Sequence, residues 1–358
     1  MSRPVSLKDV ARRAGVSFQT TSKVLNDGGT VAPATRIRIL GAAEELGYVP
    51  NALARSLITR STATIGVVAS DMSQTLLLQP IVGIEREARR HGHSVLIGSI
   101  DREGDTSEAV LRTLLERRVD GIILVAPQAE EDERVAALLR GRTPVVSTHD
   151  VAGGGIPVVH TDQHAVGLMV TRHLTSRGHR RIGTIIGARD RHVTRQRLAG
   201  YTQALREAGV DPDPALVEEG DWDVDAAYEA GHRLLDRAPD ITAIFAQNDI
   251  MAIGLLSALY DRGLRVPDQC AVIGCDDIPV AARTIPPLTT VRIPVHETGE
   301  VAARVLFDLI AERPLASPEI LMPARLVHRA STGEPHQGDA EEPPAGRESP
   351  ADALERRA

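Results

Sequence analysis

The order of apolar and polar positions near the amino terminus predicts two short helices joined by a tight turn. Over residues 7–14 the apolar positions recur at i, i+3, i+4 and i+7 and form one stripe, which consists of Leu7, Val10, Ala11 and Ala14. Ser6 suits the N-cap of this helix, and Asp9 lies three residues later, in its first turn. Gly15 ends the helix because glycine tolerates the left-handed turn that follows. Ser17 caps a second helix, so the segment reads as a helix-turn-helix.

The second helix has two faces at about 100° per residue. Thr21 and Val24 share the side that would pack on the first helix, whereas Gln19 and Lys23 point away from it. Such a polar face suits a DNA major groove, because Gln can pair with adenine and Lys with the acceptors of guanine. An ordinary solvated helix face is the alternative. Phe18 either packs in the module core or contacts a thymine methyl group.

A third helix is expected near Pro33–Leu46, with Ile37 and Leu40 facing inward. The following segment 51–57 would make a helix of about two turns, too short to be stable alone in water. Two leucines four positions apart share one face of it, the second being Leu57. Apolar side chains on a short helix suit wedging into a minor groove. A plain linker or a dimer contact would use the same pattern.

Residues 6–57 resemble the DNA-binding head and hinge helix of the lactose-repressor (LacI/GalR) family of bacterial transcription regulators. The motifs LKDVARRAGVS, T-x-S-K-VLN, TR-x-R, A-x-ELGY-x-PN and ARSL occur in order, and the resemblance extends to about residue 332. It implies a homodimer on a pseudo-palindromic double-stranded operator, with Leu57 wedged at the operator centre. Thr21 and Ala32 depart from the pattern, since Val and a capping Ser are usual there; the lost cap should cost about 1 kcal/mol. The DNA-contacting positions that this implies are Ser17, Phe18, Gln19, Thr20, Ser22, Lys23, Asn26, Arg36, Asn51, Ala54 and Leu57.

Charge is divided unevenly along the chain of 358 residues, which is long enough for two or three domains. Residues 1–60 carry nine Lys or Arg and four acidic side chains, a net +5; since the whole chain is at −7, the remainder is at −12. The overall acidity is therefore no argument against DNA binding, because the local field decides it.

The cysteines and the hydropathy indicate the compartment. Cys270 and Cys275 flank one buried strand on opposite faces and would not bridge, as expected of reduced thiols in a cytoplasmic protein. The sequence has no signal peptide and no apolar run of membrane-spanning length. Nor does it have a Cys/His cluster typical of zinc. We therefore expect a cytoplasmic, nucleoid-associated bacterial protein with no cofactor, no metal and no membrane partner.

From residue 64 onward, apolar strand-like runs alternate with amphipathic helical patterns. Continuous Val/Ile-rich strands are typical of parallel sheets covered by helices on both faces. The number of strands exceeds one typical sheet, so two doubly wound α/β lobes are expected. The strand runs are 64–70, 94–99, 121–126, 144–148, 156–161, 181–186, 243–246 and 271–276. Helical patterns include 81–91, 106–117, 165–177, 195–208 and 250–262.

The resemblance to the family implies a domain plan. Residues 1–49 would be the DNA-binding head, 50–61 the hinge and 62–332 an effector-binding and dimerisation domain similar to sugar-binding periplasmic proteins. Its first lobe would comprise about 62–161 and 294–322, and its second about 163–292 and 323–332. The segment 333–358 is rich in Pro, Glu, Asp and Arg and is expected to be disordered.

Polar residues follow several strands, where ligands of parallel α/β sheets are usually bound. Carboxylates, Asn, an Arg fork and an aromatic face would together hold a neutral polyol. Among neighbours in the sequence, Asp249 is more typical of a helix N-cap and Asp277 of a structural role, while Trp222 suits packing and contact equally. The effector contacts that the resemblance implies are Asp71, Gln74, His149, His160, Arg197, Trp222, Asn248 and Asp276.

The expected function is sequence-specific repression of transcription, relieved by a small effector that is a carbohydrate or a derivative. His160 would favour a more polar or acidic effector. A corepressor-dependent, purine-type regulator of the same family is an alternative, and so is a solute-binding receptor. An enzyme is not expected, because nucleophile-elbow, P-loop and dinucleotide motifs are missing.

Overall fold

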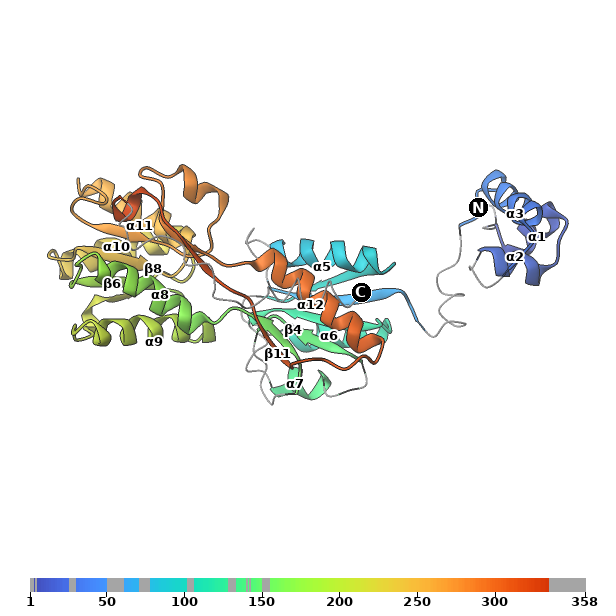
Figure 1. Cartoon of the computed structure of the whole chain (residues 1–358), viewed down its shortest axis with the longest axis horizontal. Helices are drawn as coiled ribbons and strands as arrows, with labels where there is room; N and C mark the ends of the chain where they lie inside the picture. The colour runs from blue at the N-terminus through green and yellow to red at the C-terminus, as the bar shows by residue number, and fades with distance from the viewer. Residues whose placement is uncertain are drawn as a thin grey trace. The chain divides into compact units, whose positions relative to one another are not determined.

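The computed structural model describes residues 3, 5–25, 30–49, 61–70, 78–101, 106–127, 133–139, 141, 143–149 and 155–334 (Figure 1). Several predictions fall outside these ranges. They are the ones on Asn26, on the hinge residues Asn51, Ala54 and Leu57, on Asp71 and Gln74, and on the tail from residue 335.

The amino-terminal unit is a bundle of three helices, α1 (Leu7–Ala14), α2 (Phe18–Leu25) and α3 (Pro33–Glu45). The predicted cap is present, because the Ser6 backbone N–H donates to the Asp9 carboxylate at 3.0 Å. Gly15 has a φ of 64°, the left-handed turn expected between the first two helices. The core of the bundle is formed by Val10, Ala14, Val24, Ile39, Ala42 and Ala43.

The expected inner face of α3 is wrong. Ile37 and Leu40 are 72% and 47% exposed, whereas Ile39 is fully buried. The helix carries two apolar stripes, and the second one ends in Ala42 and Ala43. These small residues let α3 approach α1 and α2 closely, so packing selects that stripe over the bulkier one.

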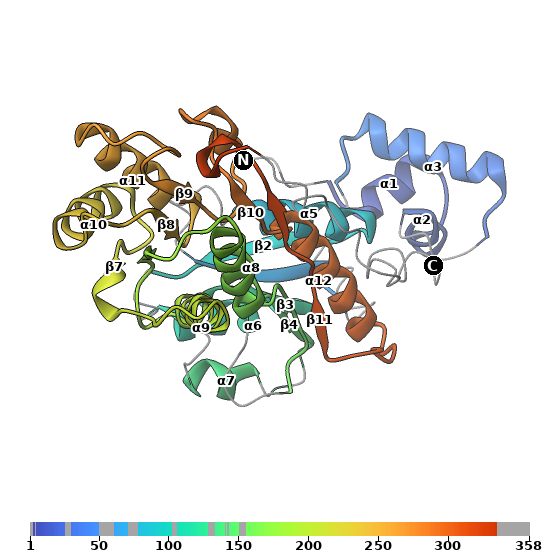
Figure 2. The same cartoon turned by 60° about the vertical axis from the view of Figure 1, so that its left-hand side comes forward.

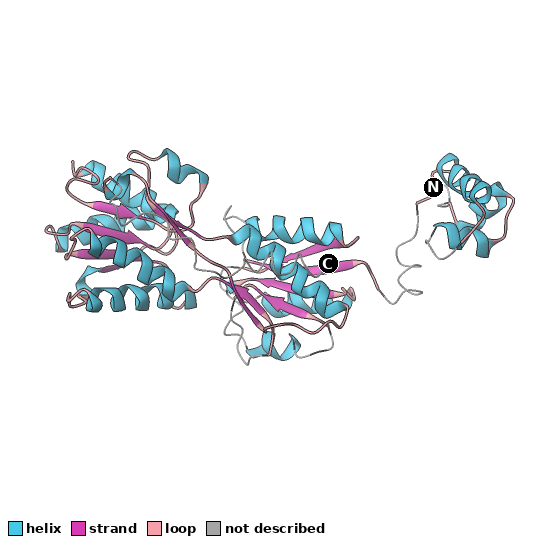
Figure 3. Ribbon diagram, in the orientation of Figure 1, coloured by secondary structure: helices cyan, strands magenta, loops and turns pink. Residues whose placement is uncertain are grey.

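The first lobe is built on a six-stranded sheet in the order β11-β5-β4-β3-β1-β2. Helices α5 (Gln79–Arg90) and α12 (Val295–Ile310) pack on one face, while α6 (Ser107–Glu116) and α7 (Glu133–Leu139) complete the lobe (Figures 1 and 3). The central strands are buried along almost their whole length, as their apolar runs predict. The strands are β1 (Thr64–Ala69), β2 (Ser94–Ser99), β3 (Gly121–Val125), β4 (Val145–Ser147), β5 (Val158–His160) and β11 (Glu319–Leu321).

The second lobe has a four-stranded parallel sheet in the order β7-β6-β8-β9. One face packs on α10 (Val224–Arg237) and α11 (Asp249–Asp261), the other on α8 (Gln163–Ser176) and α9 (His192–Glu207), as Figure 2 shows. The predicted doubly wound α/β class is thus confirmed. The strands are β6 (Ile182–Ile186), β7 (Val217–Glu219), β8 (Ala243–Ala246) and β9 (Ala271–Ile273); the short 3-10 helices are η3 (Pro214–Leu216), η4 (Pro279–Arg283) and η5 (Ala330–Thr332).

The chain passes between the two large sheets three times. It leaves β5 for α8, returns from β10 (Thr290–Arg292) to α12, and leaves β11 for β12 (Arg325–Val327). Strands β10 and β12 pair antiparallel in a separate two-stranded sheet. These crossings explain why each lobe is made of segments that are distant in the sequence.

Both cysteines are buried free thiols, and burial raises the pKa of Cys270 to about 12. Among the described residues, no helix is both long and apolar enough to cross a membrane.

Candidate functional site

The outer side of α2 presents the side chains expected to read DNA. Gln19 and Lys23 are exposed, while Thr21 and Val24 on the opposite side are buried. Phe18 is 50% exposed, which places it on the surface rather than in the module core. The face is therefore polar at two positions and apolar at one, which suits contact with base edges and thymine methyl groups in a major groove.

Ser17 fixes where this helix starts. Its hydroxyl oxygen accepts the backbone N–H of Thr20 at 3.1 Å, which satisfies one free donor of the first turn. Ser22 and Arg36 are partly exposed on α2 and α3. Six of the predicted contacts within α2 and its cap are thus on or beside one surface, whereas Arg36 comes from the start of α3.

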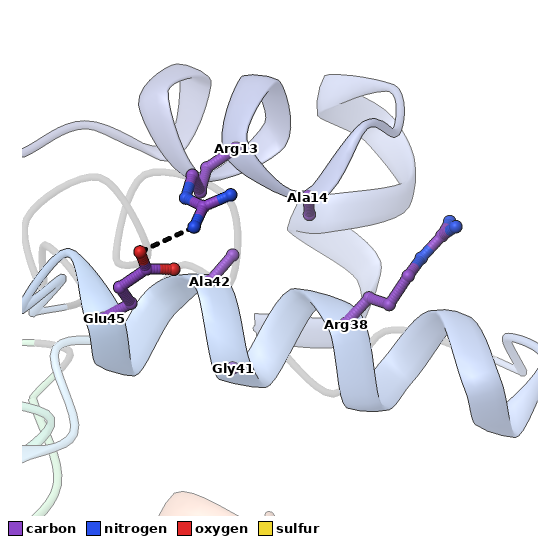
Figure 4. Close-up of a pocket in the computed structure, with 6 residues that line it drawn as sticks. All are labelled: Arg13, Ala14, Arg38, Gly41, Ala42 and Glu45. Atoms are coloured by element: carbon purple, nitrogen blue, oxygen red, sulfur yellow. Dashed lines mark hydrogen bonds and ion pairs between the residues drawn. The ribbon is translucent and has the colours of Figure 1, made fainter.

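A pocket lies between α1 and α3 (Figure 4). Arg13 closes one end by pairing with Glu45 at 2.6 Å, and Arg38 points across the other end. Ala14, Gly41 and Ala42 complete the lining. None of the predicted contact residues lines it, so the pocket is separate from the α2 face.

Arg197 is the centre of the candidate effector site in the second lobe. It lies in α9, is only 4% exposed, and donates to Gln163 Oε1 at 2.9 Å and to the backbone oxygen of Gln247. Its Nη2 lies 3.8 Å from Asp276 Oδ1, too far for a direct hydrogen bond. Gln163 and the Gln247 backbone therefore hold the guanidinium in place. Its charge faces the Asp276 carboxyl group without a direct hydrogen bond to it.

Trp222 is the second component. The Arg197 guanidinium lies 5.9 Å from the centre of its ring. The indole rests on Gly187, where a Cβ atom would come within 1.9 Å of the ring. Glycine at position 187 is thus what allows the ring to lie against the end of β6. No motif or spacing along the chain singles out Gly187, Gln163 or Gln247.

Asp276 and its neighbours form the third component. Burial raises the pKa of Asp276 to about 6, against the opposing effect of Arg197. Asn248 is the N-cap of α11, and its side-chain oxygen accepts the Met251 N–H at 2.7 Å. Capping uses one of the two lone pairs of that oxygen, and the amide nitrogen of Asn248 can donate to a ligand.

The expectation that Asp249 caps this helix is wrong. Asp249 is the first helical residue and is fully buried; its carboxylate accepts from the Thr290 hydroxyl at 2.6 Å and from the Ile278 N–H at 2.9 Å. Burial, and then the charge of Asp276, raise the pKa of Asp249 to about 8. The helix begins one residue earlier than expected, which turns the carboxylate from the cap position into the interior.

The two predicted histidines lie in the first lobe. His160, in β5, pairs with Glu319 of β11 at 2.9 Å. Burial lowers the pKa of His149 to about 4, with smaller contributions from His160 and His192. His149 is therefore neutral at physiological pH. The structure brings Arg197, Trp222 and Asp276 together and places the histidines in the other lobe.

Comparison with known proteins accounts for both parts of the chain. The model of the lacI family of bacterial regulatory proteins matches residues 6–51, and that of the periplasmic binding protein-like domain matches residues 171–332. The HTH-type transcriptional repressor CytR of Escherichia coli is 34% identical over 91% of this chain and 96% of its own length. The HTH-type transcriptional regulator CelR of Thermobifida fusca is 36% identical over 92% and 98%.

Solved structures that are similar to this chain belong to regulators of the same kind. The lac repressor dimer bound to its operator and the anti-inducer ONPF has a TM-score of 0.86 at 29% identity, covering 93% of this chain and all of that one. The CelR–cellobiose complex has a TM-score of 0.70 at 33% identity and covers 92% and 100%. These relatives are regulators of transcription rather than enzymes. The chain belongs to the lacI family of bacterial regulatory proteins.

Proposed function

We propose that the chain acts as a homodimeric repressor in the bacterial cytoplasm and nucleoid, where it binds a pseudo-palindromic operator. The observation that carries this is the exposed α2 face with Phe18, Gln19 and Lys23. In a dimer, two such helices enter successive major grooves of the operator. The lac repressor, crystallised as a dimer on its operator, supports this arrangement.

The effector is a carbohydrate or a derivative, bound between the lobes by Arg197, Trp222 and Asp276. A fixed guanidinium, an under-engaged carboxyl group and an aromatic face suit the hydroxyl groups and the apolar face of a sugar. CelR was crystallised with cellobiose, and a ribose operon repressor is 34% identical to this chain. By linkage, operator binding must weaken effector binding by the same factor by which the effector weakens operator binding.

The test is selection of bound duplexes from a random-sequence library by the full-length protein, at low and at physiological salt. We expect a pseudo-palindromic consensus whose affinity falls steeply with salt. Leu57→Ala should weaken consensus binding more than random-duplex binding, because wedging is used only on the operator. A selection that yields no sequence preference would overturn the proposal. Equal losses of affinity for consensus and random duplexes would show that Leu57 does not wedge into the operator.

Trp222 then reports the effector. We expect its fluorescence to change with at least one member of a panel that includes ribose, cellobiose and their acidic derivatives. Release of the operator by that sugar supports induction. Tighter operator binding would instead identify a corepressor, the second reading of the same site. A solute receptor, by contrast, would bind the sugar and ignore duplexes.

A further inference from the structure

The loop that carries Asp276 has an unusual backbone. It joins β9 to η4, and its two consecutive aspartates both have positive φ, 114° at Asp276 and 56° at Asp277. Residues other than glycine rarely adopt positive φ, so contacts with neighbouring segments must hold the loop in this conformation. Those contacts come from the segments that cross between the lobes.

The second of the three crossing segments, which runs from β10 to α12, lies alongside the loop. Asp276 N–H donates to the Val291 oxygen at 2.7 Å, and Asp277 N–H to the Thr290 hydroxyl at 3.3 Å. The same hydroxyl donates to the buried Asp249 carboxylate, whose other oxygen accepts the Ile278 N–H. Strand β10 and Asp249 thus hold the loop from two sides.

Asp277 joins the loop to two of the three crossing segments, β10 to α12 and β11 to β12. Its side chain is 5% exposed; one oxygen accepts from Arg292 Nε at 2.7 Å, and the other from Arg329 Nη2 at 2.5 Å. Arg292 ends β10, which leads to α12 of the first lobe, and Arg329 follows β12, which arrives from β11 of that lobe. One carboxylate therefore bridges two segments that enter and leave the first lobe.

We propose that Asp277 is a positioning residue that fixes the Asp276 carboxyl group in front of Arg197 by anchoring the loop of the two aspartates to the β10–α12 and β11–β12 crossing segments. It makes no contact with the effector itself. A change in how β10 and β12 run between the lobes moves Asp277 and, through the adjoining peptide, Asp276. This inference rests on the proposed effector site and names how that site is coupled to the lobe connections.

The test needs neither DNA nor effector, so its failure is separate from failure of the proposed function. Trp222 is the only tryptophan of the chain and faces Arg197, which faces Asp276. We expect its fluorescence in the full-length protein to titrate near pH 6, as Asp276 ionises. Asp276→Asn should remove that transition. Among the described residues, the other ionisable groups beside Asp276 include Arg197, Cys275, Asp249, Asp277 and Arg292.

Arg292→Gln is the decisive variant, because its two possible effects have opposite signs. Loss of a nearby positive charge alone would raise the midpoint of the transition. Release of the loop would expose the Asp276 carboxyl group and lower the midpoint, by about half a pH unit. We expect the fall. Arg292 is half exposed, so its replacement should leave folding intact.

The matched control is a carboxylate of the same kind, remote from the crossings. Glu218 of β7 is 13% exposed and also binds two arginines, Arg233 at 3.1 Å and Arg237 at 2.6 Å. Arg233→Gln should leave the Trp222 midpoint unchanged. A rise, or no change, with Arg292→Gln would overturn the proposal. Arg329→Gln, which removes the second partner, should lower the midpoint as well, and a rise or no change with this variant would likewise contradict the proposal.

Discussion

The α2 face presents Gln19 and Lys23 to solvent, whereas the proposed effector site in the second lobe encloses Arg197 almost completely. The first surface depends on one helix and its cap. The second draws on α9, on the loops after β6, β7 and β9, and, through Asp277, on two of the three crossing segments. Side chains that contact DNA must be exposed in order to reach base edges. Side chains that bind an effector must be connected to the segments that join the two lobes.

The largest effect should separate these two regions. Arg197→Ala removes a buried charge that Gln163 and Gln247 hold in place. We expect effector affinity to fall at least about 100-fold, roughly 3 kcal/mol. Operator affinity should stay within about threefold. Trp222 titrations and gel shifts measure the two.

Arg206→Ala is the control for that prediction, since Arg206 is an exposed residue of the same helix. It should change neither quantity. A normal response of Arg197→Ala to effector would show that the two regions were assigned incorrectly.

Gln19→Ala should act only on the DNA side. Removing one base contact should cost about 1–3 kcal/mol at a single operator position and relax the preference there. Selection experiments with the variant would show which position loses its preference. Gln203→Ala, an exposed glutamine on α9, should leave the consensus unchanged. A uniform loss over all duplexes would mean that Gln19 contacts phosphate.

The buried Asp249 makes the stability of the folded chain depend on pH. Because its folded pKa, about 8, lies above its unfolded value, folding is favoured by proton uptake, and the stability of the chain should fall as pH rises from about 4 to 8. Asp249→Asn keeps the shape without the charge. Between pH 6 and 8.5, the free energy of unfolding of this variant should fall by at least about 1 kcal/mol less than that of the wild type. Urea unfolding at several pH values measures it, and identical slopes would contradict the buried acid.

The smallest effect belongs to the head. Ala32 is the N-cap of α3 and offers no side-chain hydrogen bond. Ala32→Ser should stabilise the start of this helix by about 0.5–1 kcal/mol. Slower amide exchange over residues 34–36 would show it. The same change should not alter exchange in α9, which belongs to the other compact unit of the chain.

Local pattern was sufficient where a contact is local. The cap at Ser6, the turn at Gly15 and the exposed side of α2 follow from spacing of three or four residues, and the structure has all of them. The pattern failed on α3, where two apolar stripes compete. It also failed at the start of α11, where Asn248 and Asp249 are equally good caps in isolation.

The sequence by itself determined the helical head and the class of the two lobes, and it led to the residue types of the proposed effector site. Only the tertiary structure decided which stripe of α3 is buried, that Gly187 makes room for Trp222, and that Asp277 faces Arg292 and Arg329. The physical reason is range. A cap or an amphipathic stripe is a relation between neighbours in the chain, whereas Asp277 and Arg329 are 52 positions apart and meet only because the chain crosses between the lobes three times.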